Sequence, residues 1–254
     1  MSDPYVPESA LVVVAHPDDI EFSCAGTLAL WAQHGAELVY VVCTSGESGI
    51  DDASTSVEEA RKIREAEQRA AAEVVGVREV LFLREPDGLL QASLELRETL
   101  VGIIRRTRPE VVVSGDPTLF WINPELLNHP DHRAASLAAL EAAWPAAGQR
   151  NLYPKMEADP DLQLHRPRKF YCTGWVQPEA NTWVDIEATL ATKAAALNAH
   201  VSQTGGHDLT PLLQHQATLH ATGQEMQLAE SFRVTTLVAD DVWQQTEGNR
   251  ETGA

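Results

Sequence analysis

The sequence LVVVAHPDDIE, residues 11–21, joins an apolar run to a cluster of ionisable side chains. The run at 11–14 contains only Leu and Val without polar alternation, which is typical of a strand buried on both faces. Similar runs lie at residues 38–43, 80–83 and 111–113. Strands of this kind occur in parallel sheets that are covered by helices on both faces. The sequence therefore predicts an α/β fold.

Stretches of helical character separate these apolar runs. They lie at residues 27–34, 56–75, 94–106 and 133–143. Alternation of strand and helix predicts right-handed crossovers and a Rossmann-like, doubly wound, mainly parallel sheet with helices on both faces, a three-layer α/β/α arrangement. In such sheets functional groups gather beyond the carboxyl ends of the strands.

The second half of the chain has weaker patterns. Residues 145–168 are rich in Pro and polar side chains and are expected to form an irregular excursion. Further strands are expected at 170–176 and 182–186, followed by a helix at about 188–201. The last dozen residues, with QQTEGNRETGA at their end, are expected to be a frayed tail. No repeat or linker divides the chain, so we expect a single domain over residues 1–254.

The charge balance excludes several classes of partner. The chain has 19 Lys and Arg against 37 Asp and Glu, a formal net charge of −18. Such a chain repels nucleic acid and anionic membranes, so neither is expected as a partner. Three widely separated cysteines predict no disulfide framework. The beginning of the chain lacks the features of a signal peptide and no apolar run reaches eighteen residues, so we expect a cytoplasmic protein.

The polar stretch after the first apolar run predicts a metal site. Imidazole and carboxylate are ligands that suit a divalent transition metal, and His16 and Asp19 can converge on one ion across a turn opened by Pro17. Asp18 would then be free to take a proton from metal-activated water. The alternative is that Asp18 or Asp19 only caps the helix that follows.

A second cluster, NHPDHR at 128–133, follows the fourth apolar run. His129 and His132 are three residues apart, so both imidazoles can face one pocket. One could complete the metal shell while the other serves acid catalysis or polarises a carbonyl. The alternative is that His129 caps a helix and His132 is a solvated surface residue. Two clusters at two strand ends favour a common site.

The two clusters resemble those of a known enzyme family. AHPDDIE at 15–21 and HPDHRA at 129–134 are similar to segments of the zinc-dependent de-N-acetylases, which include LmbE-like proteins, the GlcNAc-phosphatidylinositol de-N-acetylases (PIG-L) and the deacetylases of mycothiol and bacillithiol synthesis. The resemblance covers most of the chain. Supporting segments in family order are CTSGESG at 43–49, IREAEQRAAAEVVGV at 63–77, PDG at 86–88, RPEVVVSGDP at 108–117 and KAAALNAHVSQ at 193–203.

The resemblance implies a zinc site and a general base. It assigns zinc ligation to His16, Asp19 and His132, although the same ligands also suit another divalent transition metal. It assigns the role of general base to Asp18. His129 would steady the oxyanion or protonate the leaving amine.

The resemblance also implies supporting residues. Asp131 would be the carboxylate associated with His129, and Glu47, Arg64 and Asp87 would line a sugar pocket. The alternative for Arg64 is an exposed arginine on a charged helix. His200, Ser202 and Gln203 match a family segment to which the residues assign no chemical role.

The resemblance implies a zinc-dependent hydrolase that removes an N-acetyl group from a GlcNAc-type sugar conjugate and releases acetate and a free amine. The alternatives are an amidase acting on a thiol-sugar conjugate or another amide, and a non-catalytic metal- or sugar-binding protein. A nucleotide-binding module is disfavoured because GxGxxG is absent and carboxylates stand where phosphates would bind. The expected partner is a small-molecule sugar conjugate, and the resemblance allows a homo-oligomer, a trimer or hexamer.

The chain departs from the family pattern at two places. Cys24-Ala25-Gly26 stands where paired glycines are usual, which affects helix packing. Residues 118–127 contain Phe120, Trp121 and Ile122 and look idiosyncratic. Because this segment lies just before the second cluster, we expect it to shape the substrate pocket.

Overall fold

The computed structural model describes residues 5–251, and its centre is a seven-stranded sheet. The strands are β1 (Ser9–Val14), β2 (Glu37–Thr44), β3 (Glu79–Glu85), β4 (Val111–Gly115), β7 (Lys169–Thr173), β8 (Thr182–Asp185) and β9 (Ala229–Thr236). Their order is β3-β2-β1-β4-β7-β9-β8. The first five are parallel, whereas β9 is antiparallel to both β7 and β8. The expected mainly parallel sheet is confirmed.

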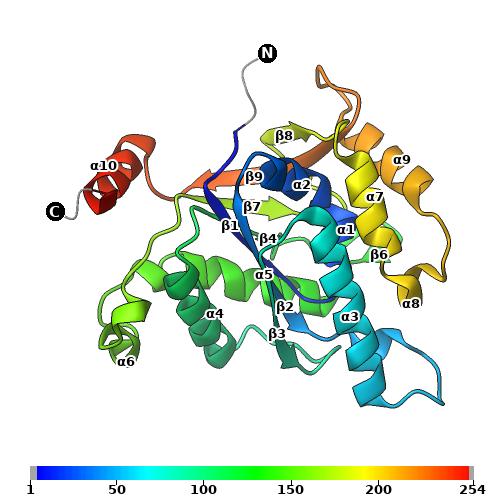
Figure 1. Ribbon diagram of the computed structural model, residues 1–254, viewed down its shortest axis with the longest axis horizontal. Coiled ribbons are helices and arrows are strands. Elements are labelled where there is room, and N and C mark those ends of the chain that lie inside the picture. Colours follow the sequence, from blue (N-terminus) through cyan, green and yellow to red (C-terminus); the bar gives the residue numbers. More distant parts are fainter. Residues whose placement is uncertain (1–4, 252–254) are drawn as a thin grey trace.

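Helices cover both faces of this sheet (Figure 1). One face carries α1 (Asp19–Ser23), α2 (Ala25–Gln33), α3 (Val57–Val75) and α7 (Leu190–Asn198), and the other carries α4 (Leu94–Thr107) and α5 (Pro130–Ala143). The side chains of strand β1 show why helices pack on both faces. Leu11 and Val13 belong to the core cluster of α4 and α5, while Val12 and Val14 belong to that of α2 and α3. Both faces of β1 are buried, which confirms the three-layer arrangement.

The C-terminal part adds elements that the sequence patterns do not reveal. Helix α9 (Thr210–His220) packs against α7 through a small core that includes Leu197, Leu213 and Ala217. The expected helix at 188–201 ends earlier, at Asn198, and a short helix α8 (Val201–Thr204) follows. Strand β9 has the sequence AESFRVTT, whose charged positions hide it from a search for apolar runs.

Residues 145–168 contain only short helical turns, namely η2 (Ala146–Gly148), α6 (Pro154–Glu157) and η3 (Pro160–Leu162). The expected frayed tail is wrong for residues 244–251, which lie within helix α10 (Asp240–Glu251). Two carboxylates, Asp240 and Asp241, favour this helix at its N-terminus, and the Trp243 ring lies 6.2 Å from the His165 ring. Residues 252–254 of the expected tail lie outside the described residues.

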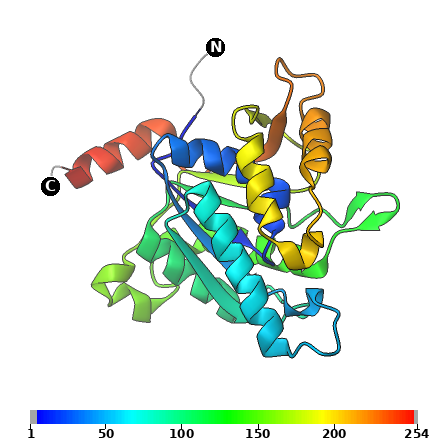
Figure 2. The same ribbon diagram turned by 45° about the vertical axis from the view of Figure 1, so that its right-hand side comes forward.

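Between β4 and α5 the chain forms a hairpin of β5 (Trp121–Asn123) and β6 (Leu126–Leu127). Figure 2 shows this hairpin, in green, projecting from the body of the molecule. Two exposed hydrophobic side chains on it are Trp121 and Leu127.

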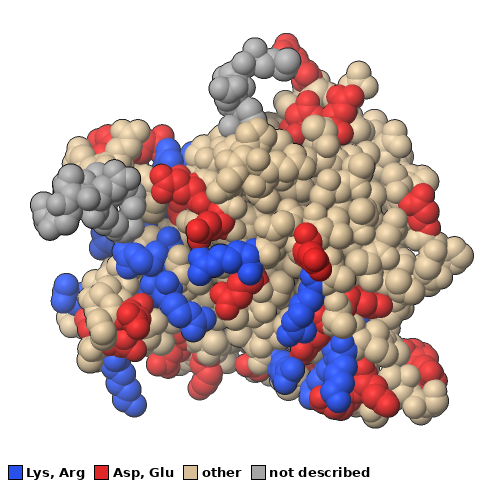
Figure 3. Space-filling model, viewed as in Figure 1, with Lys and Arg blue, Asp and Glu red and all other residues tan. Residues whose placement is uncertain are grey.

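One face of the molecule carries its charges in mixed groups. On the face in Figure 3, Lys and Arg lie beside Asp and Glu rather than in one continuous basic area. Among the described residues, no helix has the length and apolar character needed to cross a membrane.

The topology places a crevice between β1 and β4. β1 and β4 are neighbours in the sheet. From β1, the chain continues to β2 and β3 on one side, whereas β4 and then β7 lie on the other side. Such a switch point leaves space at the carboxyl ends of the two strands, where ligands bind in open α/β sheets. Both clusters singled out in the sequence follow these two strands along the chain.

Candidate active site

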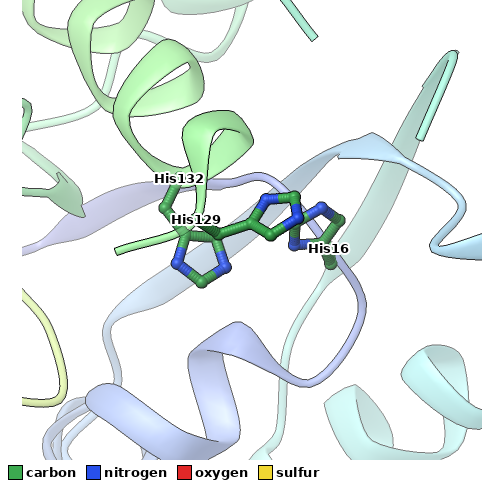
Figure 4. Close-up of side chains that lie close together, drawn as sticks. All are labelled: His16, His129 and His132. Carbon is green, nitrogen blue, oxygen red and sulfur yellow. The ribbon is translucent and has the colours of Figure 1, made fainter. Parts of the chain in front are cut away.

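Three histidines converge at the carboxyl ends of β1 and β4. His16 follows β1, while His129 and His132 lie at the N-terminus of α5. Each ring offers a nitrogen, and these nitrogens all lie within 4.8 Å of one another. Figure 4 shows the three rings close together between the start of α5 and the loop after β1. The structure thus brings the two sequence clusters into one site.

Asp19 links two of these histidines. Its Oδ1 lies 3.0 Å from Nε2 of His132, and its Oδ2 lies 3.6 Å from Nδ1 of His16. Oδ2 also accepts a hydrogen bond from the backbone N–H of His16 at 2.8 Å. Nδ1 of His132 lies 3.0 Å from Oδ1 of Asn128, which directs the other ring nitrogen toward Asp19. Two imidazoles and one carboxylate meeting in this way form a donor set that fits a divalent metal.

The far side of the His16 ring faces two further carboxylates. Its Nε2 lies 3.1 Å from Oδ1 of Asp87 and 3.3 Å from Oδ2 of Asp131. Carboxylates in this position orient a metal-binding imidazole. Burial lowers the pKa of His16, but hydrogen bonds with Asp19 and Asp87 outweigh burial and raise that pKa to about 11. The surroundings of His16 therefore favour positive charge.

Asp131 has a different neighbour from the one that the family resemblance implies. Its completely buried carboxylate accepts hydrogen bonds from the backbone N–H groups of Gly88 and Leu90 and faces His16. Only its backbone N–H reaches Nδ1 of His129, at 3.2 Å. Side chains two positions apart on a helix do not face each other, which explains the separation. The expected pairing of the Asp131 carboxylate with His129 is corrected to a pairing with His16.

Asp18 lies beside the donor set in an unusual backbone conformation. Its φ is 85°, in the left-handed region, and its side chain makes no capping hydrogen bond to α1. Its backbone N–H donates to Oε1 of Gln68 at 3.0 Å. Nη2 of Arg64 lies 3.3 Å from Oδ2 of Asp18 and donates to the Pro17 carbonyl at 2.6 Å. The capping alternative does not describe the Asp18 side chain.

Burial raises the pKa of Asp18 to about 7, although the nearby Arg64 acts to lower it. A carboxyl group that titrates near neutrality is suited to proton exchange with a substrate or water.

His129 does cap α5, because its Nδ1 accepts the Asp131 backbone N–H. Its ring also lines a polar cavity of about 420 Å³, which the residues of the donor set line as well. Burial lowers the pKa of His129, and the neighbouring His16 and His132 lower it further. The alternative of a solvated surface residue fails for His132, which contacts Asp19 directly.

Of the three residues expected in a sugar pocket, Arg64 and Asp87 line this cavity. Arg64 is buried, so the alternative of an exposed arginine is wrong. Asp87 also accepts a hydrogen bond from the backbone N–H of Ser48 at 2.8 Å. Glu47 is not among the described residues that line the cavity, and its Oε1 is held by Arg61 at 2.7 Å.

Sequence reasoning missed a buried polar group beneath Asp18. Gln68 donates to Oε1 of Glu21 at 3.0 Å, and Oε2 of Glu21 lies 3.3 Å from Nε2 of His200. All three side chains are completely buried. The four-residue spacing of Arg64 and Gln68 on one helix is a signal that could have found Gln68.

Of the two further residues that carried no assigned role, Ser202 and Gln203, only the second is among the described residues that line the cavity. The Ser202 hydroxyl donates to Oε2 of Glu67 at 2.6 Å. Gln203 lines the polar cavity and donates to the Gly49 carbonyl at 3.2 Å.

Comparison with known proteins supports the resemblance. Residues 11–143 match the family profile described as GlcNAc-PI de-N-acetylase (PIG-L). Diacetylchitobiose deacetylase of Thermococcus kodakarensis is 31% identical over 198 residues, which span 77% of this chain and 70% of that protein. The 1D-myo-inositol 2-acetamido-2-deoxy-alpha-D-glucopyranoside deacetylase of Rhodococcus erythropolis is 29% identical, covering 76% of this chain and 80% of that one.

A solved structure agrees with these relatives. The N,N'-diacetylchitobiose deacetylase from Pyrococcus horikoshii, complexed with its inhibitor MPG, superimposes with a TM-score of 0.80 and is 27% identical. The superposition covers 91% of this chain and 84% of that chain. Fold, clusters and sequence similarity agree, and the chain belongs to the GlcNAc-PI de-N-acetylase (PIG-L) family.

Proposed function

We propose that this chain is a metal-dependent hydrolase that removes the N-acetyl group from a GlcNAc-type sugar conjugate and releases acetate and a free amine. The observation that carries the proposal is the position of Asp18, which lines the polar cavity next to the donor set. Among the described contacts, its carboxylate meets Arg64 and neither histidine of that set. The relatives support this proposal, because they are named as deacetylases of acetylated sugars.

The metal ligands in this proposal are His16, Asp19 and His132, and the ion is zinc. Imidazole and carboxylate at these contacts suit Zn²⁺, and other divalent transition metals share the preference. A bound ion of this kind supplies Lewis acidity, which makes water more acidic and polarises a carbonyl.

The residues of the chain then perform the proton transfers. The Asp18 carboxylate takes a proton from the attacking water at the oxygen that Arg64 does not hold. His129, which also lines the cavity, stabilises negative charge that develops on the carbonyl oxygen or gives a proton to the departing nitrogen. Asp87 and Asp131 keep the His16 ring in place.

The polar cavity suits a sugar. Ser48, Arg64 and Gln203 line it and offer hydrogen-bonding groups for hydroxyls. A small sugar conjugate is therefore the proposed substrate. A protein that only binds a metal or sugar would need neither a base at position 18 nor a third imidazole at position 129.

A substrate panel tests the proposal. N-acetylglucosamine conjugates of malate, inositol and simple oligosaccharides are incubated with zinc-loaded protein, and free amine is measured. We expect amine from at least one conjugate, loss of the activity after treatment with a chelator, and recovery after zinc is restored. Absence of amine across the whole panel would contradict the proposal and favour another amide or a binding function.

A further inference from the structure

A second cavity of about 300 Å³ lies next to the polar one, and its lining is mostly apolar. Its lining includes residues at the carboxyl ends of β1, β4 and β7 and residues of the hairpin of β5 and β6. Residues that define it are Val14, Gly115, Leu119, Ile122, Leu126 and Trp175.

The two cavities meet at the metal-binding groups. Asp19, Phe22 and His132 line both of them. An amide bond held at these groups would therefore have one cavity on each side. One cavity offers hydrogen-bonding side chains and the other offers apolar surface.

We propose that the apolar cavity binds the acyl group of the substrate and that it takes linear acyl chains longer than acetyl. This inference rests on the amide hydrolysis of the proposed function and extends its acyl group from acetyl to longer linear chains. The preferred substrate is an N-acylated amino sugar whose sugar lies in the polar cavity.

The positions of the proton-transferring groups decide which half of the amide lies on which side. Hydrolysis breaks the C–N bond, water adds its oxygen to the acyl carbon, and the nitrogen leaves as an amine after it gains a proton. Asp18 and His129 line the polar cavity and are not among the described residues that line the apolar one. The nitrogen and its sugar therefore lie on the polar side, and the acyl carbon chain points into the apolar cavity.

The size of the apolar cavity exceeds what an acetyl group needs. Water occupies about 30 Å³ per molecule in the liquid, so a cavity of about 300 Å³ has room for about ten groups of that size. The methyl of an acetyl group fills about one of them. Each further methylene that enters apolar surroundings favours binding about fourfold.

The hairpin supplies a matched pair of positions for a test. Leu126 lines the cavity, whereas its neighbour Leu127 is not among the described lining residues. Both are exposed, at 49% and 65%, so a larger side chain at either position leaves the core intact. Leu126→Trp narrows the cavity and Leu127→Trp is the control.

The experiment compares kcat/KM for N-acetyl-, N-butanoyl-, N-hexanoyl- and N-octanoylglucosamine. We expect kcat/KM to rise about fourfold per methylene from acetyl until the cavity is filled. Leu126→Trp is expected to lower the ratio of hexanoyl to acetyl kcat/KM at least tenfold, whereas Leu127→Trp leaves that ratio within twofold.

A second readout does not depend on turnover. Calorimetry compares binding of hexanoate and acetate, the acids that the two substrates would release. We expect tighter binding of hexanoate, and loss of that difference in Leu126→Trp but not in Leu127→Trp. Equal affinity for the two acids would overturn the acyl-site proposal.

The outcomes separate this inference from the proposed function. Cleavage of the acetyl substrate with rejection of all longer chains would overturn the acyl site and leave the deacetylase proposal intact. If N-acetylglucosamine with an octyl aglycone is preferred and Leu126→Trp abolishes that preference, the cavity binds the aglycone and the proposal is wrong. If no amide is cleaved, the proposed function fails, and the calorimetric comparison alone decides the acyl site.

Discussion

Asp18 and Asp19 are adjacent carboxylates that have different surroundings. Burial raises the pKa of Asp19, but His132 and His16 outweigh burial and hold that pKa well below its usual range. Asp18 instead lies beside Arg64, and its left-handed backbone is held by Gln68. A non-glycine residue in that conformation costs on the order of 1–3 kcal/mol. This backbone conformation directs the two side chains apart, so that Asp19 meets the histidines and Asp18 meets Arg64.

Gln68 is predicted to be a positioning residue for Asp18. Gln68→Ala removes the acceptor of the Asp18 backbone N–H, and an unsatisfied buried group costs about 1–3 kcal/mol. We expect kcat to fall about 10- to 100-fold while zinc content stays unchanged, measured by steady-state kinetics and metal analysis. Glu73→Ala, an exposed position on the same helix, is the control. Wild-type kcat in Gln68→Ala would show that Asp18 does not depend on this contact.

The sequence identifies the residues of this site that lie within short motifs. His16, Asp19 and His132 stand in two clusters whose residue types predict metal binding. Gln68 and Glu21 are 47 positions apart, and His200 is farther still, so their contact arises only from packing of α1, α3 and the segment after α7. No local pattern specifies such a contact.

Among the elements, the loop after β2 and helix α3 depend on each other. Gly46 has φ +64°, and a Cβ there would lie 2.9 Å from Nη2 of Arg64 and 2.9 Å from Cδ of Pro17. A side chain at position 46 would displace the arginine that contacts Asp18. The loop thus requires glycine both for its backbone conformation and for the close approach of α3.

Gly46→Ala is predicted to lower both stability and activity. The left-handed conformation costs a residue with a Cβ about 1–2 kcal/mol, and displacement of Arg64 adds a loss of kcat of at least tenfold. Gly35→Ala is a matched control, because Gly35 has φ +94° and a Cβ there would meet nothing within 4 Å. It should lower Tm by a similar amount and leave kcat unchanged. Equal kcat in the two variants would argue against a role for Arg64.

A helix or strand is predicted from the sequence when its pattern of apolar and capping residues is strong. Strands β1 and β4 are apolar runs, and α3 has a periodic apolar face, a Ser56 cap and a terminal Gly76, so each is evident from the sequence. Strand β9 is not predicted from the sequence because the charged residues Glu230 and Arg233 interrupt its apolar pattern. Its buried charge is compatible with a strand only because partners from elsewhere in the fold satisfy it.

At the scale of the whole molecule, Glu230 joins β9 to two helices. Its carboxylate accepts the backbone N–H groups of Gly26 and Thr27 at the start of α2, and Nζ of Lys193 on α7 donates to it at 2.7 Å. The side chains of Lys193 and Glu230 are 3% and 2% exposed. This buried ion pair connects the antiparallel part of the sheet with two of the helices that cover one of its faces.

Glu230→Ala is predicted to lower the free energy of unfolding by about 3–5 kcal/mol, because it leaves Lys193 charged and buried without a partner. Urea denaturation measures the change. The double variant Glu230→Ala with Lys193→Met should recover part of the loss, since it removes the unpaired charge. A loss below about 1 kcal/mol in the single variant would show that the pair contributes little.

The net charge of −18 concerns the molecule as a whole, but a few carboxylates define its chemistry. Asp19, Asp87 and Asp131 surround His16, and Asp18 stands beside them. Composition alone does not distinguish these from the carboxylates elsewhere in the chain. These carboxylates are distinguished by their positions after β1, after β3 and at the start of α5, because the sheet topology brings those segments together.

The most direct test of the proposed catalytic site measures zinc content and turnover together in two variants. Asp18→Asn is expected to keep about one zinc per chain and to lose kcat about 10²- to 10⁴-fold, because it removes a base and no ligand. His132→Ala is expected to lose zinc affinity as well as turnover, because it removes a ligand. Full turnover in Asp18→Asn, or unchanged zinc binding in His132→Ala, would contradict these assignments.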